Sequence, residues 1–503
     1  MDPALNESSG RLAELTSWHA DWQGLRVVVF GLGVTGFAVA DTLVELGAAV
    51  LVVGGPGDDE RRQLLRVIGA EFVEQTDQTV VPTELPGFGA DLVVTSPGYP
   101  PHHALHVWAR EAGLPVWGDI ELAWRLRDKV VSATTGAPAA WILVTGTNGK
   151  TTTTQLAATM LVAGGLRAAP AGNIGIPVLD AIRDPAGFDA LVIELSSHQL
   201  HWMPGQGSVT PLAAVCLNLA DDHLEWHGSA AAYRDAKAKV YDGVELACVY
   251  NLADRATREM VEEAEVQEGA RAIGFGLGVP GPSDFGLVEG ILVDRAFLEE
   301  RRSSALELAT IDDLREAGLD SPHMTANVLA AAALARAAGV APGDIRDAVR
   351  GFRVGAHRNQ RVAEGDGILW VDDSKATNAH AAQASLAAYP SVVWIAGGLL
   401  KGIDPEPLVE RHAGRLRGVV LIGEDRSALR AAFARHAPAV TVVEVDATDT
   451  EGVMPSAVRA AASLAQAGDA VLLAPAAASF DQFDDYADRG DRFARAVREL
   501  LEP

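Results

Sequence analysis

The sequence has 503 residues, and its 48% hydrophobic content and 50 glycines are typical of a globular protein rather than a disordered or fibrous one. Its 41 basic and 67 acidic residues give a net charge of −26, which disfavours binding to a nucleic-acid backbone. At roughly 150 residues per domain, a chain of this length is expected to form about three domains.

The N-terminus, MDPALNESSGRLAEL, lacks the basic and apolar regions of an export signal, and no apolar run reaches the length of a membrane span. The two cysteines, Cys216 and Cys248, lie far apart in apolar stretches, without the spacing of a metal site or a disulfide framework. We therefore expect a protein of the reducing cytoplasm, with no membrane insertion and no nucleic-acid partner. We also expect it to be a monomer.

The N-terminal part opens with LRVVVFGLGVTGFAVADTLVELG, in which an apolar strand, a glycine-rich turn and a helix ending near Gly47 precede a second strand, AAVLVV. This order is typical of a Rossmann-like βαβ unit. A further strand, DLVVTSPG, follows, and the charged stretch 125–129 with SATTGAPAA after it indicates a linker. We predict a first domain over residues 1–129.

Two more α/β units follow this linker. The strands WILVTG, DALVIELSS and PLAAVCLNL, a hairpin around GILVD and an Ala-rich helix capped by Gly339 predict a central mononucleotide-binding domain of P-loop type over residues 130–354. The strands ILWVDD, SVVWIAGG, GVVLIG, TVVEV and DAVLLAP predict a Rossmann-like C-terminal domain over residues 355–503. The predicted fold class is α/β, with three domains.

The segment TGTNGKTTT, which overlaps the end of the strand WILVTG, is the most specific motif of the chain. Its glycines let backbone N–H groups turn toward phosphate oxygens, and the following helix adds its positive dipole end. Lys150 is placed to reach the terminal phosphates of ATP, and Thr151 is placed to bind Mg²⁺. Because Val144 occupies the first glycine position of the strict GxxxxGK[ST] pattern, an ordinary strand-to-helix turn is the alternative. Further ATP contacts are expected from Thr145, Gly146, Thr147, Asn148 and Gly149.

This loop, with GLGVTG before it, PAAASFDQF after it and no DNPR motif, resembles the Mur ligase family over essentially the whole chain. These enzymes form amide bonds in peptidoglycan synthesis at the expense of ATP, and the resemblance is to the branch that adds D-glutamate. It implies the substrates UDP-N-acetylmuramoyl-L-alanine, D-glutamate and ATP, an acyl-phosphate intermediate, two Mg²⁺ ions, and ADP and phosphate as products. Closure of the domains on the substrates is expected.

The GLGVTG turn also satisfies the GxGxxG pattern of dinucleotide-binding proteins. Such sites usually carry an acidic residue at the next strand end to bind the ribose, but Gly54 and Gly55 stand there. We therefore disfavour NAD, and the turn is interpreted either as a diphosphate cradle or as helix–strand packing. The resemblance implies that the UDP substrate contacts Gly33, Val34, Thr35, Ser96 and Asn173.

Glu194 ends the strand LVIELSS, where a carboxylate is a suitable Mg²⁺ ligand and a helix N-cap is the alternative. The resemblance implies that His223 and Lys237 join Glu194 and Thr151 at the metal ions, and that Lys150 completes the catalytic set. It further implies that CO2 converts Lys237 to a carbamate, which requires an unprotonated amine. Taken without the resemblance, Lys237 is typical of a solvated helix lysine, His223 of a loop histidine, and Lys239 is the alternative modification site.

The resemblance also places residues of the C-terminal half. Asn327, Arg358 and Asp373 would contact the nucleotide, while Met324 stands where relatives carry a second amide. Phe480 and Phe483 lie three residues apart, so we expect them to pack on one helix face instead of binding substrate. D-Glutamate is expected to contact Lys375, Thr377, Lys401, Ser479 and Tyr486.

Three other functions are alternatives. A Mur ligase that adds a different amino acid would not turn over with D-glutamate, and a folylpolyglutamate-synthetase-like ligase would lack a UDP-binding domain. A catalytically silent nucleotide-binding module would bind ATP but release no phosphate. The histidines in PHHALHVW form a poor metal site, because prolines precede them and no acid or cysteine is adjacent.

Overall fold

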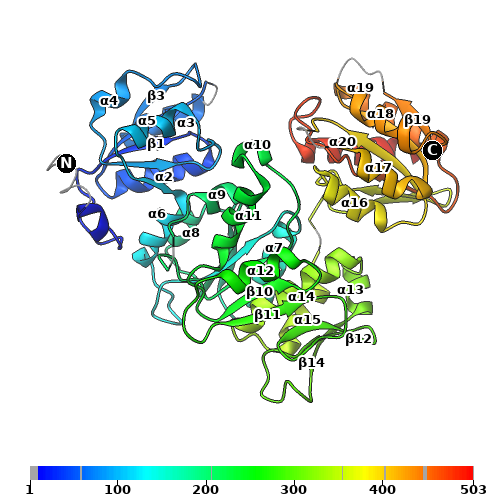
Figure 1. Cartoon of the computed structure of the whole chain (residues 1–503), viewed down its shortest axis with the longest axis horizontal. Coiled ribbons are helices and arrows are strands. Elements are labelled where there is room, and N and C mark those ends of the chain that lie inside the picture. The colour runs from blue at the N-terminus through cyan, green and yellow to red at the C-terminus, as the bar shows by residue number, and fades with distance from the viewer. Residues whose placement is uncertain are drawn as a thin grey trace. The chain divides into compact units, whose positions relative to one another are not determined.

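The computed structural model describes residues 10–56, 59–205, 207–353, 355–400, 404–445 and 450–501. The chain divides into two compact units, the first comprising Met1–Asp320 and Met324–Phe352, and the second comprising Ser321–His323 and Arg353–Pro503. Figure 1 shows helices and strands throughout both units, and the structure contains three β-sheets, as the predicted α/β class requires. The first two sheets lie in the first unit, and the third lies in the second.

The first sheet has five parallel strands in the order β3-β2-β1-β4-β5. In β1, Val27 and Val29 face one hydrophobic core while Val28 and Phe30 face another, as expected for a parallel strand buried on both sides. Because β1 lies between β2 and β4, the strand order reverses at its carboxyl end, where such sheets bind ligands. The strands are β1 Arg26–Phe30, β2 Ala49–Gly54, β3 Glu71–Glu74, β4 Leu92–Thr95 and β5 Val116–Gly118. The helices are α2 Val34–Glu45, α3 Asp59–Ile68, α4 Glu84–Phe88, α5 Ala104–Glu111 and α6 Asp119–Arg125.

The second sheet has nine strands in the order β14-β13-β12-β11-β10-β9-β6-β8-β7. Its pairs are parallel from β7 to β12, and the expected hairpin is confirmed because β12, β13 and β14 pair antiparallel. The strands are β6 Ala140–Thr145, β7 Ala168–Gly172, β8 Ala190–Glu194, β9 Ala213–Cys216, β10 Ala247–Asn251, β11 Arg271–Phe275, β12 Asp284–Val288, β13 Ile291–Asp294 and β14 Leu306–Thr310. The helices are α7 Lys150–Ala163, α8 Val178–Ile182, α9 Ser197–His201, α10 Leu224–His227, α11 Ala230–Ala238, α12 Arg255–Glu263, α13 Ile311–Ala317, α14 Pro322–Ala337 and α15 Pro342–Gly351.

The first two sheets pack against each other through shared contacts. Residues of both sheets belong to one hydrophobic core cluster. Arg183, after α8, forms ion pairs of 2.7 Å with both Asp41 and Glu45 of α2. The Gln199 amide of α9 donates to a carboxylate oxygen of Asp119 of α6 at 3.0 Å. The two sheets therefore form one compact unit.

The third sheet has six strands in the order β15-β16-β20-β17-β18-β19 and is parallel except for β15. The expectation for Phe480 is wrong: it lies in a turn before α20 and is 67% exposed, whereas Phe483 is buried in the core. The helix begins only at Tyr486, so the two rings do not share a helix face. The strands are β15 Gln360–Gly365, β16 Ile368–Asp372, β17 Val392–Gly397, β18 Leu416–Ile422, β19 Thr441–Glu444 and β20 Ala470–Leu473. The helices are α16 Ala379–Ala387, α17 Glu406–His412, α18 Ser427–His436, α19 Thr450–Leu464 and α20 Tyr486–Leu501.

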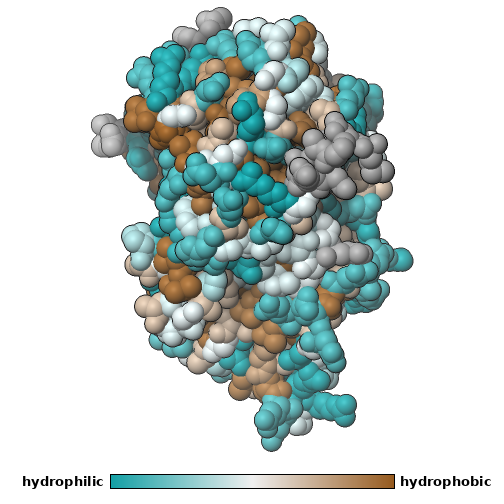
Figure 2. All heavy atoms as spheres, turned by 90° about the vertical axis from the view of Figure 1, so that its left-hand side faces the viewer, coloured by the Kyte–Doolittle hydropathy of each residue, from teal (hydrophilic) through white to brown (hydrophobic). Residues whose placement is uncertain are grey.

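None of the helices in the described ranges is both long enough and apolar enough to cross a lipid bilayer. The face drawn in Figure 2 mixes hydrophilic and hydrophobic side chains.

Candidate active site

The predicted phosphate loop lies between β6 and α7, as the sequence indicates. Its glycines adopt conformations that other residues rarely reach, with φ of 143° at Gly146 and 85° at Gly149. A Cβ atom added to Gly149 would lie 2.6 Å from the side-chain oxygen of Asn327. The loop therefore passes directly against α14, and the structure brings Asn327 next to the predicted phosphate loop.

Lys150 is the first residue of α7, and its ammonium lies over the loop that precedes it. Its Nζ donates to the carbonyl oxygens of Gly146 at 3.0 Å and Thr147 at 2.9 Å. Thr151 follows in the same helical turn and is half-buried. A fixed ammonium at the N-terminus of a helix is suited to neutralising phosphate charge.

Asn218, which the sequence analysis did not single out, holds the phosphate loop from outside. Its side-chain oxygen accepts from the Asn148 backbone N–H at 2.9 Å, and its amide nitrogen donates to the Asn148 carbonyl at 3.0 Å. The Thr147 hydroxyl lies 3.0 Å from the Tyr233 hydroxyl and 3.1 Å from the Ala220 carbonyl. These partners are distant in sequence, so no local pattern could have identified them.

We expect Asn218→Ala to weaken ATP binding about tenfold, because two loop-fixing hydrogen bonds worth roughly 0.5–1.5 kcal/mol each are lost. Titration calorimetry with an ATP analogue measures the change. Asn251→Ala is the matched control, since the Asn251 amide donates to the Leu217 carbonyl at 2.9 Å and not to the loop. Equal losses of affinity in both variants would contradict a specific role for Asn218.

Lys237, on α11, points into the protein beneath the phosphate loop. Its side chain is 1% exposed, and its Nζ donates to the Gly146 carbonyl at 2.9 Å and lies 3.4 Å from the Thr145 hydroxyl. Burial is the largest cause that lowers the pKa of Lys237 to about 7; the charge of Lys150 acts in the same direction, and Cys216, Asp222 and Glu194 oppose the shift. A large fraction of this amine is therefore unprotonated at neutral pH.

Glu194, at the end of β8, is a buried carboxylate with only one of its oxygens bound. The Asn173 side-chain amide donates to Oε1 at 2.9 Å, and the Asn173 backbone N–H donates to the Glu194 carbonyl at 3.0 Å. Oε2 is buried and has no hydrogen-bond partner within the described ranges. A carboxylate oxygen in this state suits a cation, because leaving it unsatisfied is costly.

His223 precedes α10 with φ of 52° and is 43% exposed at its side chain. Its Nε2 lies 3.6 Å from the Asp222 carboxylate, and its ring packs edge-on against His198 at 4.7 Å. Burial is the largest cause that lowers the pKa of His198 to about 3, and the charges of His223, His227 and Lys237 act in the same direction. The predicted metal ligands His223 and Lys237 thus both lie within electrostatic reach of the same imidazole.

Four of the predicted UDP-substrate residues, Gly33, Val34, Thr35 and Ser96, lie at the carboxyl ends of β1 and β4, whereas Asn173 follows β7 and donates to Glu194. Gly33 is the N-cap of α2 and provides no side-chain cap, while Val34 is 57% exposed and Thr35 is half-buried. The Ser96 hydroxyl is buried and has no hydrogen-bond partner in the described part of the chain. It lies close to Gly31, because a Cβ atom added to that glycine would be 2.9 Å from the hydroxyl oxygen. Uncapped N–H groups with a nearby hydroxyl are suited to a diphosphate.

In the second unit, Asp373, Lys375 and Thr377 follow strand β16, and Ser479 follows the neighbouring strand β20. Burial raises the pKa of Asp373 to about 6, and hydrogen bonds from the Ser385 hydroxyl and the Asn359 N–H, with the charge of Arg358, oppose this shift. The Lys375 ammonium lies 3.7 Å from the centre of the Tyr486 ring. The Thr377 N–H donates to the Lys375 carbonyl at 2.8 Å, and Ser479 is 2% exposed. Lys401 lies outside the described residues.

Comparisons with known proteins identify the family of this chain. The profile of the Mur ligase middle domain matches residues 144–335, and that of the Mur ligase, glutamate ligase domain, matches residues 357–477. A "UDP-N-acetylmuramoylalanine--D-glutamate ligase" of Leifsonia xyli subsp. xyli is 65% identical over 500 residues, which are 99% of this chain and 97% of that relative. The chain belongs to the Mur ligase family.

A further relative and two solved structures are similar to the chain at lower identity. A relative with the same printed name from Streptomyces avermitilis is 54% identical over 95% of this chain and 99% of its own length. A pseudomurein peptide ligase type C from Methanothermus fervidus has a TM-score of 0.53 at 16% identity, covering 95% of this chain and 100% of that one. A UDP-N-acetylmuramoyl-L-alanyl-D-glutamate--2,6-diaminopimelate ligase structure reaches 0.50 at 19% identity, with coverages of 90% and 93%. At these identities, the structural likeness shows the fold alone.

Proposed function

We propose that this Mur ligase joins D-glutamate to UDP-N-acetylmuramoyl-L-alanine, with conversion of ATP to ADP and phosphate. The observation that carries the proposal is the 65% identity, over nearly its whole length, to an enzyme of that name. The phosphate loop and the buried pair Glu194 and Lys237 are the groups that such a reaction needs.

The reaction has two steps. A carboxylate oxygen of the UDP-linked L-alanine attacks the γ-phosphorus of ATP, a new O–P bond forms, and the bond to ADP breaks. The D-glutamate amine then attacks the acyl carbon, phosphate leaves, and the nitrogen loses a proton. Lys150 and the first backbone N–H groups of α7 offset the charge on the transferred phosphoryl group.

The donor set fits Mg²⁺. This ion is usually held by one or two carboxylates together with substrate phosphates, and the unpartnered Oε2 of Glu194 is such a ligand. The Thr151 hydroxyl would join Glu194 at one ion, and His223 with a carbamate on Lys237 would hold a second. When bound, Mg²⁺ supplies positive charge that stabilises the phosphates.

We propose that Lys237 carries this carbamate. An unprotonated amine adds CO2 and releases a proton, so the group changes from a cation to an anion. The lowered pKa of Lys237 supports the reaction near neutral pH. Lys239, the alternative, instead donates to the carbonyls of His201 at 2.8 Å and Met203 at 3.0 Å.

We assign the other predicted contacts by substrate. The UDP group would contact Gly33, Val34, Thr35, Ser96 and Asn173. Beside the loop residues Thr145, Gly146, Thr147, Asn148, Gly149, Lys150 and Thr151, ATP would contact Asn327, Arg358 and Asp373. D-Glutamate would contact Lys375, Thr377, Lys401, Ser479 and Tyr486. We propose domains over residues 1–129, 130–354 and 355–503. We also propose a monomer, and a cytoplasmic location because ATP and UDP-sugars are cytoplasmic metabolites.

An amino-acid panel tests the function. Purified protein receives ATP, Mg²⁺ and UDP-N-acetylmuramoyl-L-alanine with D-glutamate, L-alanine, meso-diaminopimelate or L-glutamate, and phosphate and product mass are measured. We expect rapid phosphate release and an amide product with D-glutamate alone. Turnover with another amino acid instead of D-glutamate would assign a different Mur ligase, and ATP binding without any release would indicate a silent module.

A further inference from the structure

Arg489, in the first turns of α20, is fully buried and bridges two loops of the second unit. Its side chain is 0% exposed. Nε donates to the Ser374 hydroxyl at 2.9 Å, Nη2 donates to the Ser374 carbonyl at 2.8 Å, and Nη1 donates to the Ala477 carbonyl at 3.1 Å. Burial lowers the pKa of Arg489 to about 10, so the guanidinium keeps its charge at neutral pH.

The two bridged loops follow the neighbouring parallel strands β16 and β20. The first loop carries Lys375 and Thr377, and the second carries Ser479 before α20 begins at Tyr486. The Ala476 N–H also donates to the Ala376 carbonyl at 2.9 Å, although Ala476 has φ of 60°. A non-glycine residue in this region is strained, so surrounding bonds must hold it in place.

Gly490 shows how closely α20 approaches the base of the first loop. A Cβ atom there would lie 2.1 Å from Nδ1 of His357 and 2.7 Å from a carboxylate oxygen of Asp372. These two side chains are joined at 2.7 Å, and the other Asp372 oxygen accepts from the Ser374 N–H at 3.0 Å. Ser374 is therefore held by Arg489 of the helix and by Asp372, against which the helix packs at Gly490.

We propose that Arg489 is a positioning residue for the amino-acid pocket, which sets the spacing between the loop carrying Lys375 and Thr377 and the loop carrying Ser479. The inference rests on the proposed function. Arginine suits this task because its planar fork spans acceptors on both loops, whereas a lysine ammonium cannot reach all of them in the same geometry. The side-chain hydrogen bonds that Arg489 makes within the described residues go to Ser374 and Ala477, which are not predicted substrate contacts.

The test compares steady-state kinetics of Arg489→Met, Arg489→Lys and Ser374→Ala with the wild type. We expect KM for D-glutamate to rise about tenfold or more in Arg489→Met and by less in the other two. KM for UDP-N-acetylmuramoyl-L-alanine stays unchanged in all three, because its predicted contacts lie in the first unit. Arg489→Lys and Ser374→Ala decide the outcome if circular dichroism shows that Arg489→Met does not fold.

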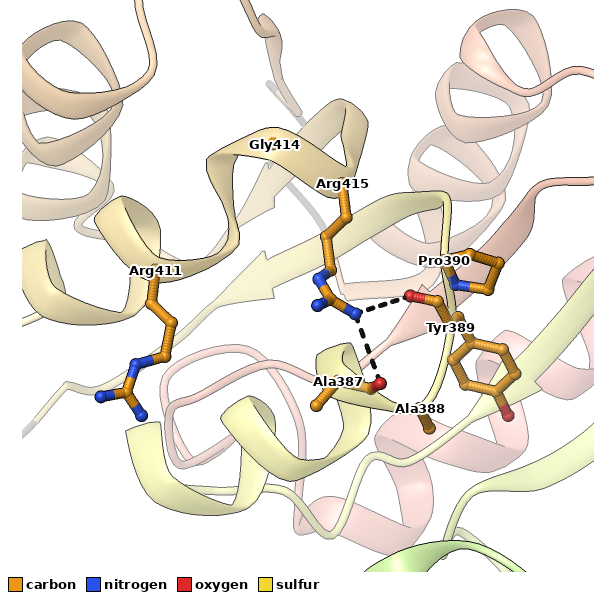
Figure 3. Close-up of a pocket in the computed structure, with 7 residues that line it drawn as sticks. All are labelled: Ala387, Ala388, Tyr389, Pro390, Arg411, Gly414 and Arg415. Carbon is orange, nitrogen blue, oxygen red and sulfur yellow. Dashed lines mark hydrogen bonds between the residues drawn. The ribbon is translucent and has the colours of Figure 1, made fainter.

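Arg415 provides a matched control in the same unit (Figure 3). Its Nη1 donates to the carbonyls of Leu386 and Ala387 at 3.3 Å and of Tyr389 at 3.0 Å, away from both loops. Arg415→Met should lower the melting temperature without changing KM for D-glutamate. An unchanged KM in folded Arg489 variants, or equal rises for both substrates, would overturn the inference. Failure of the wild type to use D-glutamate would instead overturn the proposed function.

Discussion

Lys150→Met is expected to lower kcat for amide formation by about a thousandfold or more, because one fixed positive charge is removed from the phosphoryl-transfer step. The Lys150 ammonium is held at the loop by the carbonyls of Gly146 and Thr147, and α7 begins at the same residue. Methionine keeps most of the length of the side chain and removes both the charge and the N–H donors. Phosphate release at saturating substrates measures the effect.

The control for this variant is Lys129→Met. Lys129 pairs with Glu45 and lies over the Trp18 ring at 3.7 Å, remote in the fold from the phosphate loop. This variant should keep wild-type kcat. If Lys150→Met kept more than a tenth of wild-type kcat, Lys150 would not be the phosphate-neutralising residue.

Lys237→Ala should lower ligation by at least about a hundredfold, because the carbamate proposed to hold a metal ion cannot form. The carbamate also makes CO2 uptake, and the activity that requires it, depend on pH. With a pKa of about 7, the amine is mostly protonated below that pH and mostly free above it. CO2 uptake should therefore increase as pH rises from 6 to 8, and activity limited by CO2 should increase with it.

Carbon-13 NMR of protein in labelled bicarbonate detects the carbamate without relying on turnover. The Lys239→Ala protein should retain the carbamate signal and most of its activity, whereas Lys237→Ala should lose both. A signal that survives in Lys237→Ala would assign the modification elsewhere. Near-wild-type ligation by Lys237→Ala would refute the carbamate outright.

Local patterns predicted the phosphate loop because a strand, two glycines and a helix start are all consecutive in sequence. Asn218 and Arg489 escaped prediction because their bonds span 70 and 115 residues, and neither side chain belongs to a motif. The strand β15 was missed because its residues are half-buried or exposed and therefore show no apolar run. The helix expected at Phe480 is absent because α20 begins six residues later.

Gly54 departs from the dinucleotide pattern for a reason that only packing reveals. A Cβ there would lie 3.1 Å from the Cβ of Leu32 and 3.2 Å from the Phe72 ring. Any larger side chain would push against the turn between β1 and α2. Packing of Leu32 and Phe72 therefore favours a glycine at this strand end. The sequence alone shows only that the acidic residue of the dinucleotide pattern is absent.

The Gly146 carbonyl accepts from both Lys150 and Lys237, at 3.0 Å and 2.9 Å. ATP phosphates consequently compete with these two backbone oxygens for the N–H donors of the Lys150 ammonium. The measured affinity for ATP then reports the difference between these two sets of bonds, and its binding enthalpy should be small for so highly charged a ligand. Conversion of Lys237 to an anion would leave Lys150 as the one ammonium on that oxygen, so the supply of CO2 would tune the affinity for ATP.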